Sequence, residues 1–154
     1  MKVKWLLSIV LLLLSMNCDH DDGVSSAKTM LDTTPHEIVN MYWSGGHISA
    51  DINWRFISYE EVEGGITVTG AWNVDMRNVG TSRYQVAITK FTFEDEDEFQ
   101  ISVYDPGNYD IFSVMLDAGE SVQRQGNFTI AVTSVDIANS IVFMTLWARI
   151  SEVG

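Results

Sequence analysis

The fold of this chain is decided by the stretch Ile66–Phe93, ITVTGAWNVDMRNVGTSRYQVAITKFTF, in which apolar and polar residues alternate. Side chains of an extended chain point to opposite faces in turn, so such a pattern is typical of strands with one buried face. It predicts two strands that are joined at Asn78-Val79-Gly80 and form an antiparallel hairpin. The residues expected on the buried face of the first strand are Ile66, Val68, Trp72, Val74 and Met76.

Two irregularities in this stretch carry further predictions. Apolar residues occupy even positions up to Ile88, whereas Phe91 and Phe93 occupy odd positions. A β-bulge near Thr89 or Lys90 would return both phenylalanines to the core, because one extra residue reverses the phase. Gly70 lies on the inward face, which predicts a bulge or the close approach of a ring or backbone.

The remaining body shows the same rhythm in shorter segments. Strands are expected around Ile48–Phe56, Phe99–Val103, Phe112–Leu116, Phe128–Val132 and Ile141–Ile150, the last more covered than its neighbours because both its faces are apolar. The polar segment Val122–Asn127 could be the continuation of an edge strand. His36–Trp43 fits an edge strand or a single helical turn, and Val135–Ser140 a helical turn. The pattern predicts one domain, 36–154, folded as an antiparallel immunoglobulin-like β-sandwich of about seven or eight strands; a closed barrel is the alternative.

The N-terminus has the layout of an export signal. Two lysines among the first four residues precede the apolar run Trp5–Leu14, which is too short to cross a bilayer as a helix. The only cysteine, Cys18, lies four positions after Leu14, and the segment resembles the signal of bacterial lipoproteins. This resemblance implies a signal peptide at 1–17 and a lipid on Cys18. Ordinary secretion with cleavage after Ala27 is one alternative, and an uncleaved anchor is another.

Residues 18–35 are polar and are expected to form a flexible tether. Its start, Asp19-His20-Asp21-Asp22, is similar to the acidic patch of some surface-exported lipoproteins of Gram-negative bacteria; an acidic spacer repelled by the membrane is the alternative. With no second cysteine, an exported domain has no internal disulfide, and its stability must come from the core.

Charge narrows the range of partners. The formal charge is −12 and falls to −14 without Lys2 and Lys4, which disfavours a nucleic-acid partner. Two acidic stretches, 94–98 and 105–110, read as loops, with calcium binding as the alternative for both. No cofactor and no other metal site is predicted.

Part of the chain resembles the FxLYD and CARDB types of immunoglobulin-like envelope domain. The residues that carry the resemblance are Thr69–Val74, Asn78-Val79-Gly80, the alternating run Tyr84–Phe93, and the turn Leu116–Ser121. The resemblance implies an interaction or scaffold module and transfers no active-site residue. The expected function is therefore that of a non-catalytic protein of the bacterial cell envelope, held to a membrane by lipid on Cys18, on the outer membrane's periplasmic or surface face, with an envelope protein as partner.

Carbohydrate binding is the alternative function, because aromatic rings bind sugar faces. Trp54 and Trp72 are in phase with aliphatic residues and are expected in the core, which leaves Trp147, Tyr104 and Tyr109 as candidates. An enzyme is not expected. The sequence has no Gly-x-Ser-x-Gly motif, and Ser44-Gly45-Gly46-His47 is better explained as a turn.

Overall fold

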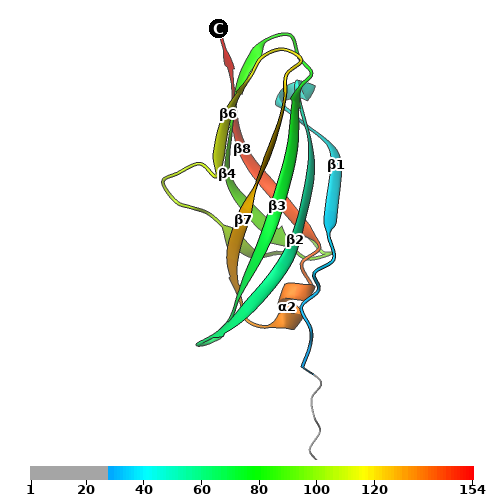
Figure 1. Ribbon diagram of the computed structural model, residues 1–154, viewed down its shortest axis with the longest axis vertical. Coiled ribbons are helices and arrows are strands. Elements are labelled where there is room, and N and C mark those ends of the chain that lie inside the picture. Colours follow the sequence, from blue (N-terminus) through cyan, green and yellow to red (C-terminus); the bar gives the residue numbers. More distant parts are fainter. Residues whose placement is uncertain (1–27) are drawn as a thin grey trace, which may run out of the picture.

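The computed structural model describes residues 28–154, which form two antiparallel sheets packed face to face (Figure 1). This confirms the predicted class, an antiparallel β-sandwich of seven or eight strands. The elements are β1 (His36–Trp43), η1 (Ser44–Gly46), β2 (Ile48–Val62), β3 (Gly65–Asn78), β4 (Arg83–Glu94), β5 (Gln100–Tyr104), β6 (Phe112–Leu116), β7 (Ser121–Val132), α2 (Val135–Asn139) and β8 (Phe143–Val153).

The first sheet has the strand order β1-β2-β3-β7. In the second sheet β4 is central: it pairs with β8 along one edge and with β6 and then β5 along the other. The chain crosses between the sheets after β3, after β6 and after β7. The apolar faces of both sheets enclose one core.

The predicted hairpin of β3 with β4 is wrong, because these strands lie in different sheets. Both edges of β3 are occupied, by β2 and β7. The connection to β4 is fixed by Asn78, which is fully buried: its Nδ2 donates to Ser82 O (2.7 Å) and Leu116 O (3.0 Å), and its Oδ1 accepts from Gly80 N (2.9 Å). The turn residues therefore hold a crossover between the sheets.

The predicted irregularities are both present. The register of β4 against β8 shifts between Ile88 and Lys90, and Ile88, Phe91 and Phe93 are all completely buried, which confirms the bulge. Gly70 faces the ring of Phe128, and a Cβ built on it would lie 2.6 Å from Cε2 of that ring. The inward glycine thus makes room for an aromatic side chain from β7.

An aromatic cluster fills the centre of the core. Trp54 makes edge-on contacts with the rings of Phe56, Phe93 and Phe128, at centroid distances of 5.3 to 6.4 Å. Trp72 stacks on Phe112 at 5.4 Å and contacts Phe91 edge-on at 5.6 Å. Trp54 and Trp72 are 2% and 6% exposed, so both belong to the core as expected.

The edges of the sandwich differ in part from expectation. His36–Trp43 forms an edge strand, β7 is the other edge of the first sheet, and Val135–Asn139 is a short helix, all in line with the sequence. The expectation that Ile141–Ile150 is more covered than its neighbours is wrong, because β8 is an edge strand and the outer side chains of Phe143 and Trp147 are exposed. Within residues 28–154, no helix has the length and apolar character needed to span a bilayer.

The last part of the predicted tether lies against the domain. Asn139 of α2 holds it with two hydrogen bonds, from Asp32 N to Oδ1 (2.8 Å) and from Nδ2 to Met30 O (2.9 Å), while Leu31 packs on the core. Lys28 pairs with Glu61 at 2.6 Å. This blue N-terminal segment runs beside α2 in Figure 1. The predicted signal peptide, Cys18 and the rest of the tether lie outside the described residues.

Candidate binding surface

An exposed tryptophan on the outer face of the second sheet is the main feature of the candidate site. Beyond the bulge, Lys90 of β4 pairs in register with Trp147 of β8, and both side chains point away from the core. Trp147 is 49% exposed, and the Lys90 Nζ lies 4.3 Å from its ring centroid. The bulge that returns two phenylalanines to the core thus also presents a cation to this ring.

Hydrogen bonds fix the orientation of the Trp147 ring. Its Nε1–H donates to Thr92 Oγ1 (3.2 Å), and the Thr92 hydroxyl donates to Glu94 Oε1 (2.8 Å). The other carboxylate oxygen of Glu94 accepts from Thr145 Oγ1 (3.1 Å). A ring held in one orientation loses little conformational entropy when a ligand stacks on it.

Lys90 also lies in the wall of a polar hollow of about 200 Å³, whose lining does not include Trp147. Its lining also includes Arg149, whose Nη2 pairs with Asp110 Oδ1 at 2.6 Å, and Tyr109, which is 78% exposed. The β5–β6 connection, which supplies most of the lining, projects from the body in Figure 1. The complete lining is Thr89, Lys90, Asp105, Gly107, Asn108, Tyr109, Asp110 and Arg149.

Two of the three aromatic residues expected to be exposed, Trp147 and Tyr109, are exposed. Lys90 contacts the ring of Trp147 and lines the hollow together with Tyr109, whereas Tyr104 is half-buried against Phe91 at a centroid distance of 6.0 Å. Sequence reasoning missed Lys90 and Arg149, because their position depends on the pairing of β4 with β8.

In each of the two acidic loops, the first aspartate accepts hydrogen bonds from the backbone of its own loop. Asp95 Oδ1 accepts from the backbone N–H groups of Asp97 (3.0 Å) and Phe99 (2.9 Å). Asp105 Oδ1 accepts in the same way from Gly107 N (2.7 Å). In the part of the chain that the structure describes, no three His, Cys, Asp or Glu side chains are grouped so that they could hold a metal ion.

The two described histidines contact aromatic rings. His36 stacks on Trp54 at a centroid distance of 4.2 Å, and burial lowers its pKa, an effect that the nearby Asp32 carboxylate opposes. His47 stacks on Tyr84 at 5.7 Å. Ser44–Gly46 forms the single turn η1 with Gly45 at positive φ, in line with the prediction of a turn.

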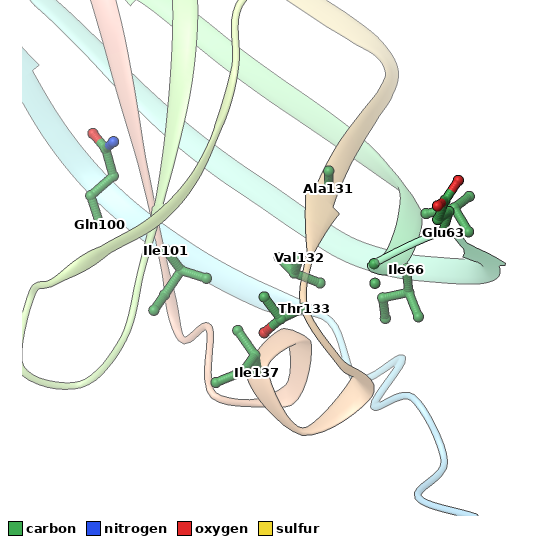
Figure 2. A pocket seen from close by; sticks show the side chains of 11 residues that line it. Glu63, Ile66, Gln100, Ile101, Ala131, Val132, Thr133 and Ile137 are labelled. Carbon is green, nitrogen blue, oxygen red and sulfur yellow. The ribbon is translucent and has the colours of Figure 1, made fainter.

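A larger and mostly aliphatic hollow, of about 450 Å³, lies where the tip of the β2–β3 hairpin meets β5, β7 and α2 (Figure 2). Ile66, Val132 and Ile137 point into this region from three different elements. Glu63 is the only ionisable residue of its lining. The hollow therefore lacks the paired titratable groups that acid–base chemistry requires.

Comparison with known proteins identifies no family. No protein-family model matches the chain, and no curated protein is similar to it in sequence. Several solved structures show some likeness in fold. A target of the Northeast Structural Genomics Consortium matches with a TM-score of 0.42 and 8% identity. The match covers 54% of this chain and 62% of that chain, which is less than two thirds of its length.

Two further structures come from named bacteria. A DUF1425 family member from Shewanella sp. pv-4 matches with a TM-score of 0.29 and 15% identity, over 78% of this chain and 93% of that chain. The trimeric lipoprotein SadB of Salmonella enterica matches with a TM-score of 0.28 and 11% identity, over 84% of this chain and 72% of that chain. With TM-scores below 0.5, these likenesses carry no conclusion about function.

Proposed function

We propose that this chain is a lipid-anchored protein of the bacterial cell envelope whose β-sandwich is a non-catalytic interaction module. The observation that carries the proposal is the position of Cys18, the only cysteine, directly after a short apolar run that follows two lysines. The described domain supports it further, since its histidines stack on core rings and its loop carboxylates cap backbone turns.

Lipid attachment can be tested in a bacterial host with an alkyne-tagged fatty acid. The full-length protein should incorporate the label and fractionate with membranes, and Cys18→Ser should abolish both. Ser25→Ala is the matched control, since it alters the rival cleavage region without touching the thiol, and it should label normally. A mature protein that begins with an unmodified Lys28 would refute the lipid anchor.

A second candidate function, saccharide binding, is favoured by one specific observation. Two aromatic residues, Trp147 and Tyr109, are exposed; Lys90 contacts the ring of Trp147 and shares the lining of a polar hollow with Tyr109. Saccharide binding combines stacking on an aromatic face with hydrogen bonds from hydroxyl groups to polar side chains. A glycan array probed with the full-length protein tests this function. The protein should bind a glycan, and the Trp147→Ala variant should not.

A further inference from the structure

We propose that the aliphatic hollow at the tip of the β2–β3 hairpin holds an acyl chain of the lipid on Cys18 while the protein is outside a membrane. This inference rests on the proposed lipid anchor and adds where the lipid lies before it enters a bilayer. The hollow, at about 450 Å³, falls within the range of roughly 300–1,000 Å³ that is typical of pockets for small ligands. It is therefore large enough for a substantial part of an acyl chain.

The lining of the hollow suits a hydrocarbon chain. Ile66, Val132 and Ile137 point into this region from β3, β7 and α2 (Figure 2). Val62 and Ile137, which are 48% and 38% exposed, leave apolar surface in contact with water. Glu63 is the only ionisable residue of the lining, so an uncharged occupant fits the hollow better than an anion. Burial of hydrocarbon here is favourable because it removes apolar area of both partners from water.

The described chain begins beside this hollow. Glu61 lies directly opposite Ile66 in the register of β2 with β3, and directly opposed residues of antiparallel strands share one face of the sheet. Lys28, the first described residue, pairs with Glu61 at 2.6 Å. The segment that follows Cys18 therefore enters the domain next to a residue that lines the hollow.

The segment between Cys18 and the domain is long enough to bring the lipid back to this place. Cys18 and Lys28 are ten positions apart. An extended chain of this length spans at most about 33–36 Å. Two groups joined by so short a linker meet at an effective concentration in the millimolar range. An acyl chain on Cys18 can thus fill the hollow even if their contact is weak.

Insertion into a bilayer would empty the hollow. Because Val62 and Ile137 remain exposed at the hollow, it covers only part of an acyl chain, whereas the hydrocarbon core of a bilayer covers all of it. Hydrophobic stabilisation grows with the apolar area that is removed from water, so a bilayer is the more favourable environment for the chain. The docked form is therefore the form of the protein before it reaches its membrane.

The test uses a fatty acid that carries an alkyne tag and a photoactivatable diazirine, supplied to a bacterial host that makes the full-length protein. The labelled protein is extracted in detergent, the detergent is removed, and irradiation is followed by mass spectrometry of peptides. Most adducts should lie in peptides that contain residues 62–66 or 131–137. Phosphatidylcholine vesicles added before irradiation should lower these adducts at least about fivefold, because the bilayer takes up the chain.

Three variants separate the hollow from the surrounding surface. Ile137→Glu should lower the adducts at least about fivefold, because a carboxylate in the hollow would lose its hydration when hydrocarbon covers it. Val62→Glu should do the same from the hairpin tip, which covers the case in which the helix variant fails to fold. Val79→Glu is the matched control: this valine is also 48% exposed but follows the other end of β3, and its replacement should leave the adducts unchanged.

The outcomes distinguish the docking from the anchor. Label on Cys18 with adducts spread over the whole domain, or adducts that neither glutamate variant reduces, would overturn the docking and leave the lipid anchor standing. Covalent dimers after irradiation would mean that the hollow receives the chain of a second copy, which would also overturn it. Absence of label from Cys18 would overturn the anchor and the docking together.

Discussion

Gly70 marks the tightest inward contact of the first sheet, and its replacement is the sharpest test of the core. A Cβ at this position would lie 2.6 Å from Phe128 Cε2 and 2.7 Å from Arg55 O. Overpacking of a close-packed core typically costs about 1–3 kcal/mol. Gly70→Ala is therefore expected to lower the free energy of unfolding by about 2–3 kcal/mol, as measured by urea denaturation.

A double-mutant cycle separates the ring contact from the backbone contact. Phe128→Leu removes the ring and should restore part of the stability that Gly70→Ala loses, whereas the contact with the Arg55 carbonyl remains. Additive losses in the double variant, or an unchanged midpoint for Gly70→Ala, would show that this close approach does not constrain the core.

His36 gives the fold a dependence on pH. Its pKa is below the ordinary value of about 6.5 because it is partly buried against Trp54. The unfolded chain therefore binds the proton more readily, so the contribution of neutral His36 is complete above pH 6.5 and declines as pH falls below it. His36→Phe keeps a ring on Trp54 and should make the loss of thermal stability between pH 7 and pH 5 shallower.

Replacement of Asp32 should have the opposite effect on this pH dependence. Its carboxylate raises the pKa of His36 and so opposes the effect of burial. Asp32→Asn should steepen the same pH dependence, because the folded-state pKa of His36 then falls further. Identical slopes in the wild type and in His36→Phe would contradict the assignment to this histidine.

At the scale of single elements, the bulge in β4 sets which side chains enter the core. Phe91 and Phe93 are completely buried only because Thr89 is the additional residue in the strand. Deletion of Thr89 would turn both rings toward solvent, at about 1.5–3 kcal/mol each, which together approaches the whole stability of a small domain. We expect the deletion variant to show no cooperative unfolding transition in near-ultraviolet circular dichroism.

The matched control is Thr89→Ala, which keeps the residue count. It removes only the hydrogen bond from Thr89 Oγ1 to Trp147 O (3.1 Å), which contributes about 1 kcal/mol. If the deletion variant unfolded cooperatively at a temperature close to that of Thr89→Ala, the bulge would not decide which side chains of β4 face the core.

The properties of single strands also explain which features could be predicted from the sequence. Alternation reports which side chains are buried, so it located the strands, the bulge and the inward glycine. It does not report which strands pair, because that depends on contacts between distant residues such as the hydrogen bond from Asn78 to Leu116 O. The same limit applies to the site: Trp147 and Tyr109 could be predicted as exposed, but the contact of Lys90 with Trp147 and the pairing of Arg149 with Asp110 could not be predicted.

At the scale of the whole molecule, acidic residues gather at the end where the chain enters the domain. The tip of the β2–β3 hairpin carries Glu60, Glu61 and Glu63, and the loop after β4 begins at Asp95. The carbonyl of Glu94 accepts from Val142 N, so this loop lies next to the exit from α2. If lipid on Cys18 holds the chain at an anionic membrane, repulsion at this end keeps the domain away from the lipid surface.

This concentration of like charge should make stability depend on salt. Raising the ionic strength from about 0.01 M to about 0.15 M shortens the Debye length from roughly 30 to 8 Å. The added salt therefore screens the repulsion between the tip of the β2–β3 hairpin and the loop after β4. The melting temperature of the full-length protein should rise by a few degrees, as scanning calorimetry would show. The double variant Glu96→Gln/Asp97→Asn should raise the melting temperature at low salt and reduce its increase with salt. Arg124→Gln removes a positive charge and should make that increase larger. A melting temperature that stays constant or falls with salt would mean that contacts such as Lys28 with Glu61 outweigh the repulsion.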